Sequence, residues 1–289
     1  MEEEKVRKSV REGYAKIAED GLCCGSSATC CGDSTTYEEM SKKIGYTEEE
    51  MKSIPKESNL GLGCGNPVAL ASLKEGETAI DLGSGGGVDC FLAAKKVGKS
   101  GKVIGVDMTP AMIDKARENA RKCNSKNVEF RLGEIENLPV ADNTADVIMS
   151  NCVINLAPNK KKVFEEAFRV LRPGGRLMVS DIVLLKELTE AVKKKAHPAS
   201  CVKGAMMKDK YLETIRQAGF EDVKIIKETQ YSFEDVVSDP NAKVIIADGK
   251  KGTQELRNVS ELGKEAQEVV KDTLTATMSI SVSAIKPLK

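Results

Sequence analysis

The pattern of apolar and polar positions changes near Glu77. From there to Leu184, short apolar runs alternate with segments in which apolar residues recur at helical spacing. Alternation of this kind predicts an α/β fold, a doubly wound Rossmann-like sheet that is mostly parallel, with helices on both faces and right-handed crossovers. The expected strands are Thr78–Leu82, Lys102–Val106, Val128–Leu132, Ala145–Asn151 and Arg176–Leu184. The expected helices between them are Val88–Val97, Pro110–Cys123 and Lys160–Leu171.

The flanking segments are less regular. Residues 1–20 and 37–52 have helical patterns, with a Cys-rich loop between them, and a glycine-rich loop follows at 56–67. The last alternating run, Met278–Ile285, predicts a strand that ends the sheet in an antiparallel hairpin. Between Leu185 and that run we expect helices at Lys208–Ala218 and Glu255–Lys271 and strands at Asp222–Thr229 and Val244–Ala247. The expected division is an N-terminal helical, Cys-rich extension (1–70), a nucleotide-binding core (71–185) and a C-terminal part that completes the sheet (186–289).

The charge balance narrows the choice of partners. The 289 residues contain 44 basic and 44 acidic side chains, which gives no electrostatic reason to expect nucleic acid or an anionic membrane. The apolar runs are shorter than a membrane span, and the acidic and basic start of the chain lacks the apolar region of a signal peptide. We therefore expect a cytoplasmic protein.

A glycine-rich turn follows the first predicted strand, in the motif Asp81-Leu-Gly-Ser-Gly-Gly-Gly87. Glycines there let a ligand approach the backbone, and the following helix offers free N–H groups. The dinucleotide fingerprint requires Gly or Ala where this chain has Val88, and Asp81 would repel a pyrophosphate but not a cation. Asp107 ends the next strand, where a carboxylate can accept both ribose hydroxyls. The order of strand, glycines, helix, strand and acid predicts a nucleoside cofactor with a cationic group.

Other residues are expected to surround the same cofactor. Glu134 could meet the ribose or the adenine amino edge, and Ile135 could pack on the ring. Asn151 ends the fourth strand, at the carboxyl edge where open α/β sheets bind ligands. The acids of this loop could equally be solvated side chains. The complete set of expected cofactor residues is Asp81, Gly83, Ser84, Gly85, Gly87, Asp107, Met108, Glu134, Ile135, Glu136 and Asn151.

Cysteine is unusually frequent for a chain of this kind. The nine cysteines are an odd number, and a chain of this size has no need of disulfide staples, so soft-metal or redox chemistry is favoured. The only histidine is His197, which leaves almost no material for a Cys/His zinc site or a histidine base. Cys90 and Cys123 lie within or at the end of predicted helices and are expected to fill space. The pairs Cys23-Cys24 and Cys30-Cys31 could capture a soft metal or arsenic, or could belong to an unoccupied loop.

Several motifs together resemble a known family. Asp81–Gly87, Val106-Asp-Met-Thr-Pro110 and Leu171-Arg-Pro-Gly-Gly-Arg176 resemble class I S-adenosylmethionine methyltransferases. More narrowly, the chain resembles the arsenite methyltransferases in three cysteine-containing segments. These are Asn59-Leu-Gly-Leu-Gly-Cys-Gly-Asn-Pro67, Ser150-Asn-Cys-Val-Ile-Asn-Leu156 and Ser200-Cys-Val-Lys-Gly-Ala205. The resemblance runs from about Tyr14 to Phe220 and implies that Cys64, Cys152 and Cys201 are the arsenic-binding and redox cysteines.

The chemistry implied is an in-line methyl transfer from S-adenosylmethionine to thiol-bound trivalent arsenic. Because the arsenic lone pair is the nucleophile, no general base is required, which agrees with the scarcity of histidine. A disulfide that includes Cys64 could then return electrons to arsenic, with thioredoxin or glutathione as the thiol reductant. Two alternatives stay open: a carbon methyltransferase of a quinone-like acceptor, and a non-catalytic cysteine-rich metalloid sensor or buffer.

Overall fold

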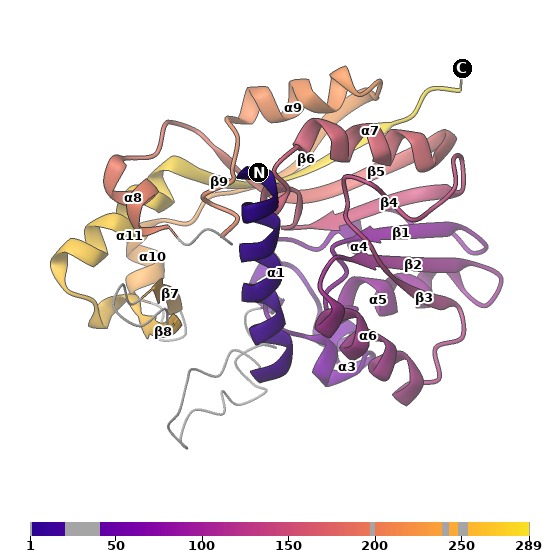
Figure 1. The fold of residues 1–289 in the computed structure, drawn as a ribbon, viewed down its shortest axis with the longest axis horizontal. Coiled ribbons are helices and arrows are strands. Elements are labelled where there is room, and N and C mark those ends of the chain that lie inside the picture. Colours follow the sequence, from indigo (N-terminus) through magenta and orange to yellow (C-terminus); the bar gives the residue numbers. More distant parts are fainter. Residues whose placement is uncertain (1, 21–40, 197–199, 239–242, 248–253, 289) are drawn as a thin grey trace.

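A computed structural model describes residues 2–20, 41–196, 200–238, 243–247 and 254–288. Strands and helices alternate through the centre of the chain as the sequence predicts (Figure 1). The central elements are β1 (Thr78–Leu82), α5 (Val88–Val97), β2 (Lys102–Asp107), α6 (Pro110–Lys122), β3 (Val128–Leu132), β4 (Ala145–Asn151), α7 (Lys160–Val170) and β5 (Leu171–Leu184).

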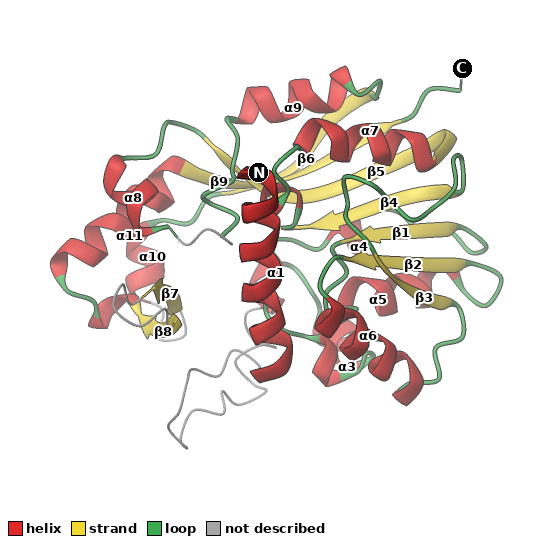
Figure 2. Ribbon diagram, viewed as in Figure 1, coloured by secondary structure: helices red, strands yellow, loops and turns green. Residues whose placement is uncertain are grey.

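One seven-stranded sheet organises the chain (Figure 2). Its strand order is β3-β2-β1-β4-β5-β9-β6, where β6 is Glu221–Thr229 and β9 is Thr277–Ile285. The first five strands are parallel, and β9 is antiparallel to both of its neighbours. The prediction of a mostly parallel Rossmann-like sheet with an antiparallel C-terminal pair is confirmed. Because β1 lies at the centre and the chain leaves it in both directions, the carboxyl ends of β1 and β4 form the switch point where open α/β sheets bind ligands.

Helices cover both faces of the sheet. On one face, Phe164 and Ala167 of α7 pack with Tyr211 and Ile215 of α9 (Lys208–Gln217) over fully buried strand residues such as Leu177. On the other face, α4 (Pro67–Leu70), α5 and α6 form a second core with strand residues. Both faces are therefore closed, which explains why β1, β2 and β4 are almost continuously apolar.

The N-terminal segment crosses the carboxyl ends of the strands (Figure 1). Helix α1 (Glu2–Asp20) confirms the first predicted helix and packs beside α6. The second predicted helix, 37–52, is wrong as one unit. A helical turn at 41–44 is followed by a separate short helix, α3 (Glu48–Lys52), because Thr47 caps α3 and forms a capping box with Glu50.

The C-terminal part contains one more wrong prediction. The sequence predicts one helix over residues 255–271, but Gln254–Asn258 is strand β8, paired antiparallel with β7 (Lys243–Ala247). Helix α11 (Lys264–Ala276) begins only after these strands. Acidic and basic residues at helical spacing in this segment did not distinguish a strand from a helix. Helices α8 (Glu190–Lys195) and α10 (Phe233–Ser238) complete this end, and no described helix is long and apolar enough to cross a membrane.

Candidate functional site

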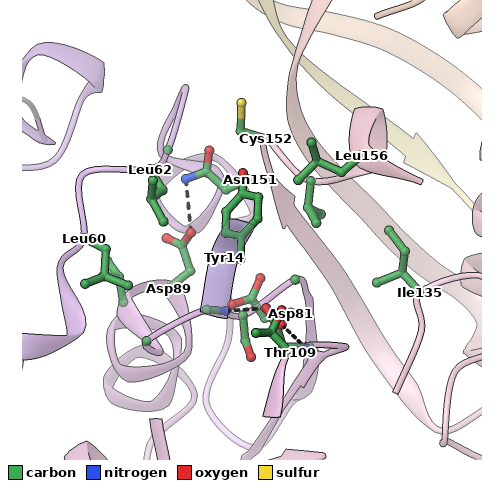
Figure 3. Close-up of a pocket in the computed structure, with 18 of the residues that line it drawn as sticks. Tyr14, Leu60, Leu62, Asp81, Asp89, Thr109, Ile135, Asn151, Cys152 and Leu156 are labelled. Atoms are coloured by element: carbon green, nitrogen blue, oxygen red, sulfur yellow. Dashed lines mark hydrogen bonds between the residues drawn. The ribbon is translucent and has the colours of Figure 1, made fainter. Parts of the chain in front are cut away.

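A large cavity opens at the carboxyl edge of the sheet. It measures about 1090 Å³ with its open mouth and lies among the ends of β1, β2 and β4, the 58–63 loop and helix α1 (Figure 3). This is the position that the topology predicts for a ligand. The expected cofactor residues that line it are Asp81, Gly83, Ser84, Gly85, Asp107, Met108, Ile135, Glu136 and Asn151. Gly87 caps α5 behind the cavity and Glu134 lies outside its lining.

The glycine turn after β1 has a conformation that needs glycine. Gly83 adopts φ 69°, and a Cβ atom there would lie 2.3 Å from the Val153 side chain. The Gly83 and Ser84 amides donate to the Val106 carbonyl, which ties the turn to β2. Asp107 accepts hydrogen bonds from the Gly85 amide at 3.0 Å and the Thr109 amide at 2.8 Å. Asp107 is therefore held rigidly beside the glycines, with its carboxylate on the cavity wall.

The buried carboxylates of Asp81 and Asp89 also line the cavity. Burial raises the pKa of Asp81 well above its usual value, and the nearby Asp89 raises it further. Burial also raises the pKa of Asp89 to about 6, against the hydrogen bond that Tyr46 donates at 2.7 Å and the one that Asn151 donates at 3.1 Å. A cationic ligand stabilises the ionised form of buried carboxylates, because its positive charge offsets the cost of their desolvation. The cavity thus suits a molecule with a positively charged group.

Helix α1 closes one side of the cavity through an ion pair. Arg7 lies 3.1 Å from the carboxylate of Glu136 and 3.4 Å from that of Glu134. The Glu136 side chain is only 4% exposed, whereas Glu134 is 38% exposed. Of these two acids, Glu136 is therefore the one that lies inside the site. Both acids hold α1 in place through their ion pairs with Arg7. Val10 and Tyr14 of the same helix also line the cavity.

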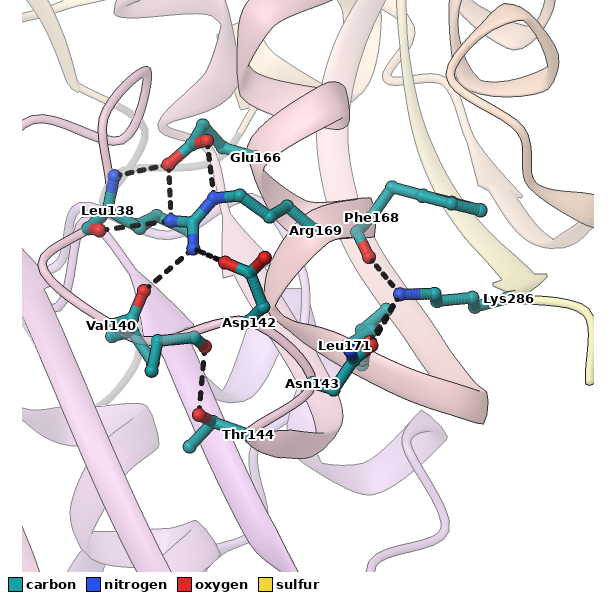
Figure 4. A network of polar contacts seen from close by, with 11 residues as sticks. Leu138, Val140, Asp142, Asn143, Thr144, Glu166, Phe168, Arg169, Leu171 and Lys286 are labelled. Carbon is teal, nitrogen blue, oxygen red and sulfur yellow. Dashed lines mark hydrogen bonds and ion pairs between the residues drawn. The ribbon is translucent and has the colours of Figure 1, made fainter.

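Arg169 anchors the loop that carries Ile135 and Glu136 (Figure 4). Its guanidinium makes two 2.7 Å hydrogen bonds to Glu166 and a 2.6 Å bond to Asp142. It also donates to the carbonyls of Leu138 and Val140. A bidentate pair with additional carbonyl contacts fixes the loop between β3 and β4 against α7.

The three cysteines singled out by the sequence converge above the cavity. The sulfur atoms of Cys152 and Cys201 lie 3.0 Å apart, and the Cys201 thiol also donates to the Cys152 carbonyl at 2.9 Å. Ligand atoms of Cys64, Cys152 and Asp181 all lie within 4.8 Å of one another. Cys64 is placed by its own amide, which donates to Asn151 at 3.0 Å, and by its carbonyl, which accepts from Ser279 at 2.8 Å. Thiols from three distant segments thus form one cluster.

Close backbone approaches hold this cluster together. Cys152 adopts φ 59°, an unusual conformation for a residue with a side chain, and its amide donates to Ser180 of β5 at 2.8 Å. A Cβ atom on Gly204 would lie 1.9 Å from the Asn155 carbonyl, so only glycine lets the Cys201 segment pack there. Backbone strain of this kind gathers at functional sites.

Protonated thiols are favoured in the cluster. The hydrogen bond from Cys152 favours the Cys64 thiolate, but burial and nearby Asp181 outweigh it and raise the Cys64 pKa. The hydrogen bond with Cys152, followed by burial, raises the pKa of Cys201 well above its usual value. For Cys152, the Cys201 hydrogen bond lowers the pKa, but contact with Cys64 and burial leave it well above the usual value. A soft electrophile that binds all three sulfur atoms would have to displace their protons.

A buried polar network supports the thiols. Asp181 is 1% exposed and accepts hydrogen bonds from Asn155 at 2.8 Å, the Ile182 amide at 2.9 Å and the Tyr211 hydroxyl at 3.3 Å. Burial raises its pKa to about 7. Asp181 is not among the predicted site residues, although an acid in the middle of the apolar run 177–184 is a recognisable signal. Asp89, Tyr46 and Tyr14 are not among them either, because they belong to helices or loops whose spacing gives no sign of the cavity.

The remaining cysteines have other surroundings. Cys90 is fully buried in the core and donates to Asp81 at 3.3 Å, and Cys123 is exposed at the end of α6. Neither joins the thiol cluster, as the sequence predicts. Cys23, Cys24, Cys30 and Cys31 lie outside the described residues, as does His197, so their expected roles stay predictions.

These features define a class of protein: a Rossmann-like fold with an acidic cavity at the carboxyl edge of its sheet and a thiol cluster beside that cavity. The methyltransferase domain family matches residues 73–219, and the chain belongs to this family. The prediction of a methyltransferase domain is thereby confirmed.

Individual relatives narrow the comparison. The chain is 49% identical over 231 residues to an arsenite methyltransferase of Halobacterium salinarum, covering 77% of this chain and 59% of the relative. It is 34% identical to an arsenite methyltransferase of Aquipseudomonas alcaligenes, covering 80% of this chain and 66% of the relative. A solved structure of an arsenic(III) S-adenosylmethionine methyltransferase from Chlamydomonas reinhardtii has a TM-score of 0.58 and 28% identity, covering 86% of this chain and 73% of that one. The chain thus spans about three fifths to two thirds of the length of these curated relatives.

Proposed function

We propose that this protein transfers the methyl group of S-adenosylmethionine to trivalent arsenic held by Cys64, Cys152 and Cys201. The observation that carries the proposal is the position of the thiol cluster. Cys152 lines the cofactor cavity, and its sulfur lies 3.0 Å from that of Cys201. The acceptor would therefore be held directly beside the methyl donor.

The cavity residues suit the parts of this cofactor. Asp107, held by the Gly85 and Thr109 amides, would accept the ribose hydroxyls. The apolar side chains of Met108 and Ile135 would enclose the adenine ring, and both line the cavity. Asp81 and Asp89 would stabilise the positive charge of the methionine end, which accounts for two buried carboxylates with raised pKa values. When bound, the cofactor supplies an electrophilic methyl group on a sulfonium.

The thiol cluster suits the acceptor. Trivalent arsenic is a soft centre, for which thiolates are the natural ligands. Three protein sulfur atoms would leave the arsenic lone pair free to attack the methyl carbon as the bond from carbon to the sulfonium breaks. Catalysis would then rest on positioning, because a fixed nucleophile beside the donor has a high effective concentration. No proton has to leave the nucleophile, so Asp181 and the acids around the cavity need not act as a base.

The redox step concerns the same cysteines. Methylation formally oxidises arsenic by two electrons, and two thiols could return them by forming a disulfide that includes Cys64. A thiol reductant such as thioredoxin or glutathione would then reduce that disulfide by exchange. The sulfur atoms of Cys64 and Cys152 lie within 4.8 Å of each other, which supports this step because a disulfide requires neighbouring sulfur atoms.

The test is a turnover assay. Purified protein is incubated with S-adenosylmethionine, a thiol and arsenite, and we expect methylated arsenic together with one S-adenosylhomocysteine for each methyl group transferred. Absence of both products from protein that binds cofactor would refute the proposal. Arsenic binding without product would favour the metalloid sensor, and turnover of a quinone-like acceptor alone would favour the carbon methyltransferase.

A further inference from the structure

A buried carboxylate lies against the thiol cluster and has no part in the proposed methyl transfer. Ligand atoms of Cys64, Cys152 and Asp181 all lie within 4.8 Å of one another. The three residues come from separate segments, since Cys64 precedes α4, Cys152 follows β4 and Asp181 belongs to β5. The fold therefore brings an oxygen ligand to two of the cysteines, in addition to the third sulfur atom.

Hydrogen bonds fix the two oxygen atoms of Asp181 differently. Oδ1 accepts from the Asn155 side chain at 2.8 Å and from the Ile182 amide at 2.9 Å. Among the described residues, Oδ2 accepts from the Tyr211 hydroxyl at 3.3 Å, which leaves it a lone pair for a further partner. Hydrogen bonds of this kind orient the carboxylates that bind metal ions in proteins. The Asp181 side chain is thus held in the way that a metal ligand is held.

The cysteines belong to two overlapping ligand sets. The Cys64 thiol donates to the carbonyl of Ser180, the residue before Asp181 in β5, at 3.4 Å. The sulfur of Cys201 lies 3.0 Å from that of Cys152, and the Cys201 thiol donates to the Cys152 carbonyl. Cys64 and Cys152 are therefore shared by two sets. Cys201 completes the proposed arsenic set, and Asp181 completes the second set.

The spacing and charge of the second set suit a divalent cation. Zn²⁺ binds thiolates at about 2.3 Å and carboxylates at about 2.0–2.2 Å, so tetrahedral ligands lie roughly 3.5–3.8 Å apart, inside the 4.8 Å span of these atoms. Two thiolates and a carboxylate would leave one net negative charge on the complex. Burial lowers the pKa of Lys160, and the nearby Asp181 opposes that shift, so a basic group lies within reach of this charge.

From this arrangement we propose that Cys64, Cys152 and Asp181 bind a thiophilic divalent cation such as Zn²⁺, with the fourth position open to water, and that the bound cation excludes arsenic from the cluster. The exclusion rests on the proposed function, whereas the metal site does not. The two thiols release their protons to water as the metal binds, and no electron is transferred. Because Cys64 and Cys152 are shared, zinc would inhibit the enzyme in competition with arsenite.

The experiment measures metal binding and arsenite binding separately. Protein reduced with a phosphine is titrated anaerobically with Co²⁺, whose charge-transfer absorption reports thiolate ligands, and Zn²⁺ is then added to displace the cobalt. Arsenite retained after gel filtration, with and without zinc, is quantified by elemental mass spectrometry. Metal bound by other cysteines contributes equally to each protein and cancels in the comparison of variants.

Two variants distinguish the ligand sets. Asp181→Asn keeps the size of the side chain and can still accept the hydrogen bonds from Asn155 and Ile182, but it removes the anionic ligand. Cys201→Ser removes the sulfur that belongs to the arsenic set alone. Cys123→Ser is the matched control, because Cys123 is exposed at the end of α6, away from the cluster.

We expect Asp181→Asn to weaken cobalt binding about tenfold or more, and to weaken arsenite binding much less. Cys201→Ser should show the opposite order, and Cys123→Ser should change neither affinity. Zinc should weaken arsenite binding to the unmodified protein far more than to Asp181→Asn. Absence of thiolate-bound cobalt, equal losses of both affinities in Asp181→Asn, or arsenite binding that zinc leaves unchanged would overturn the proposal. Selective cobalt binding by a protein that forms no methylated arsenic would keep the metal site and reject the proposed methyl transfer.

Discussion

The sulfur of Cys152 lies 3.0 Å from the sulfur of Cys201, although 49 residues separate them in the chain. This is a hydrogen-bonding distance and is well beyond a disulfide bond of about 2.05 Å. The protein therefore presents these two thiols close together and reduced, and Cys64 is near enough to complete a three-sulfur site. Because the fold already holds the three thiols close together, less conformational entropy is lost when they bind a common ligand.

The first prediction separates acceptor binding from cofactor binding. Cys152→Ser and Cys201→Ser should each weaken arsenite binding at least tenfold, because two thiolates remain where three are required, and should leave S-adenosylmethionine affinity nearly unchanged. Asp107→Ala should do the reverse, since it removes a charged hydrogen-bond acceptor worth about 1–3 kcal/mol. Arsenic retained after gel filtration and calorimetric titration with the cofactor measure the two affinities. Equal loss of both affinities in the cysteine variants would contradict separate sites.

A second prediction concerns pH. The pKa of Asp89 is raised by burial to about 6, and a cationic cofactor favours the ionised carboxylate. Below that pH, Asp89 of the folded protein is mostly protonated and must release its proton before the cationic cofactor binds. S-adenosylmethionine affinity should therefore fall about tenfold between pH 7 and pH 5.

The Asn variant identifies the group responsible. Asp89→Asn should bind more weakly at pH 7 and lose this step, whereas Asp114→Asn, at an exposed position of α6, should retain it. Equilibrium dialysis at several pH values provides the measurement. A step that persists in Asp89→Asn would assign it to another group.

Helix α1 provides the third prediction. Arg7→Ala leaves Glu136 buried without its cation, and removing one partner of a buried ion pair costs about 3–5 kcal/mol. The protein can relieve that cost by releasing α1, so the variant should lose cofactor affinity and expose residues 2–20 to proteolysis. Arg11→Ala is the control, because Arg11 pairs with the exposed Glu4 on the same helix. Limited proteolysis followed by mass spectrometry measures both. If α1 of Arg7→Ala were cleaved no faster than that of the unmodified protein, the ion pair of Arg7 with Glu136 would not be what holds the helix in place.

The sequence predicts the sheet and the cofactor turn well, because both depend on local signals. Apolar runs and glycines fix strands such as Thr78–Leu82 to the residue, and the sheet order then brings Asp81 and Asp107 to one edge. Contacts between residues that are far apart in the sequence cannot be predicted from such local signals. The pairing of Arg7 with Glu136, over 129 residues, leaves no local pattern, and neither does the position of Lys227 near Cys64. The sequence pattern does not distinguish strand β8 from a helix, because its residues are mostly polar and its strand conformation depends on pairing with β7.

The last prediction tests whether the loop before β4 shapes the site. Arg169→Ala removes five hydrogen bonds, to Glu166, Asp142 and the carbonyls of Leu138 and Val140, and leaves those groups partly unsatisfied. We expect a loss of about 2–3 kcal/mol of folding stability, measured by urea denaturation. The cofactor affinity should also fall several-fold, since Ile135 and Glu136 belong to the same loop. Arg172→Ala is the matched control. Arg172 is exposed, and its polar partners among the described residues are Asp146 and the Asn143 carbonyl, so its removal should change stability by less than about 1 kcal/mol. If Arg169→Ala lost stability but kept full cofactor affinity, the network would support the fold without shaping the cavity.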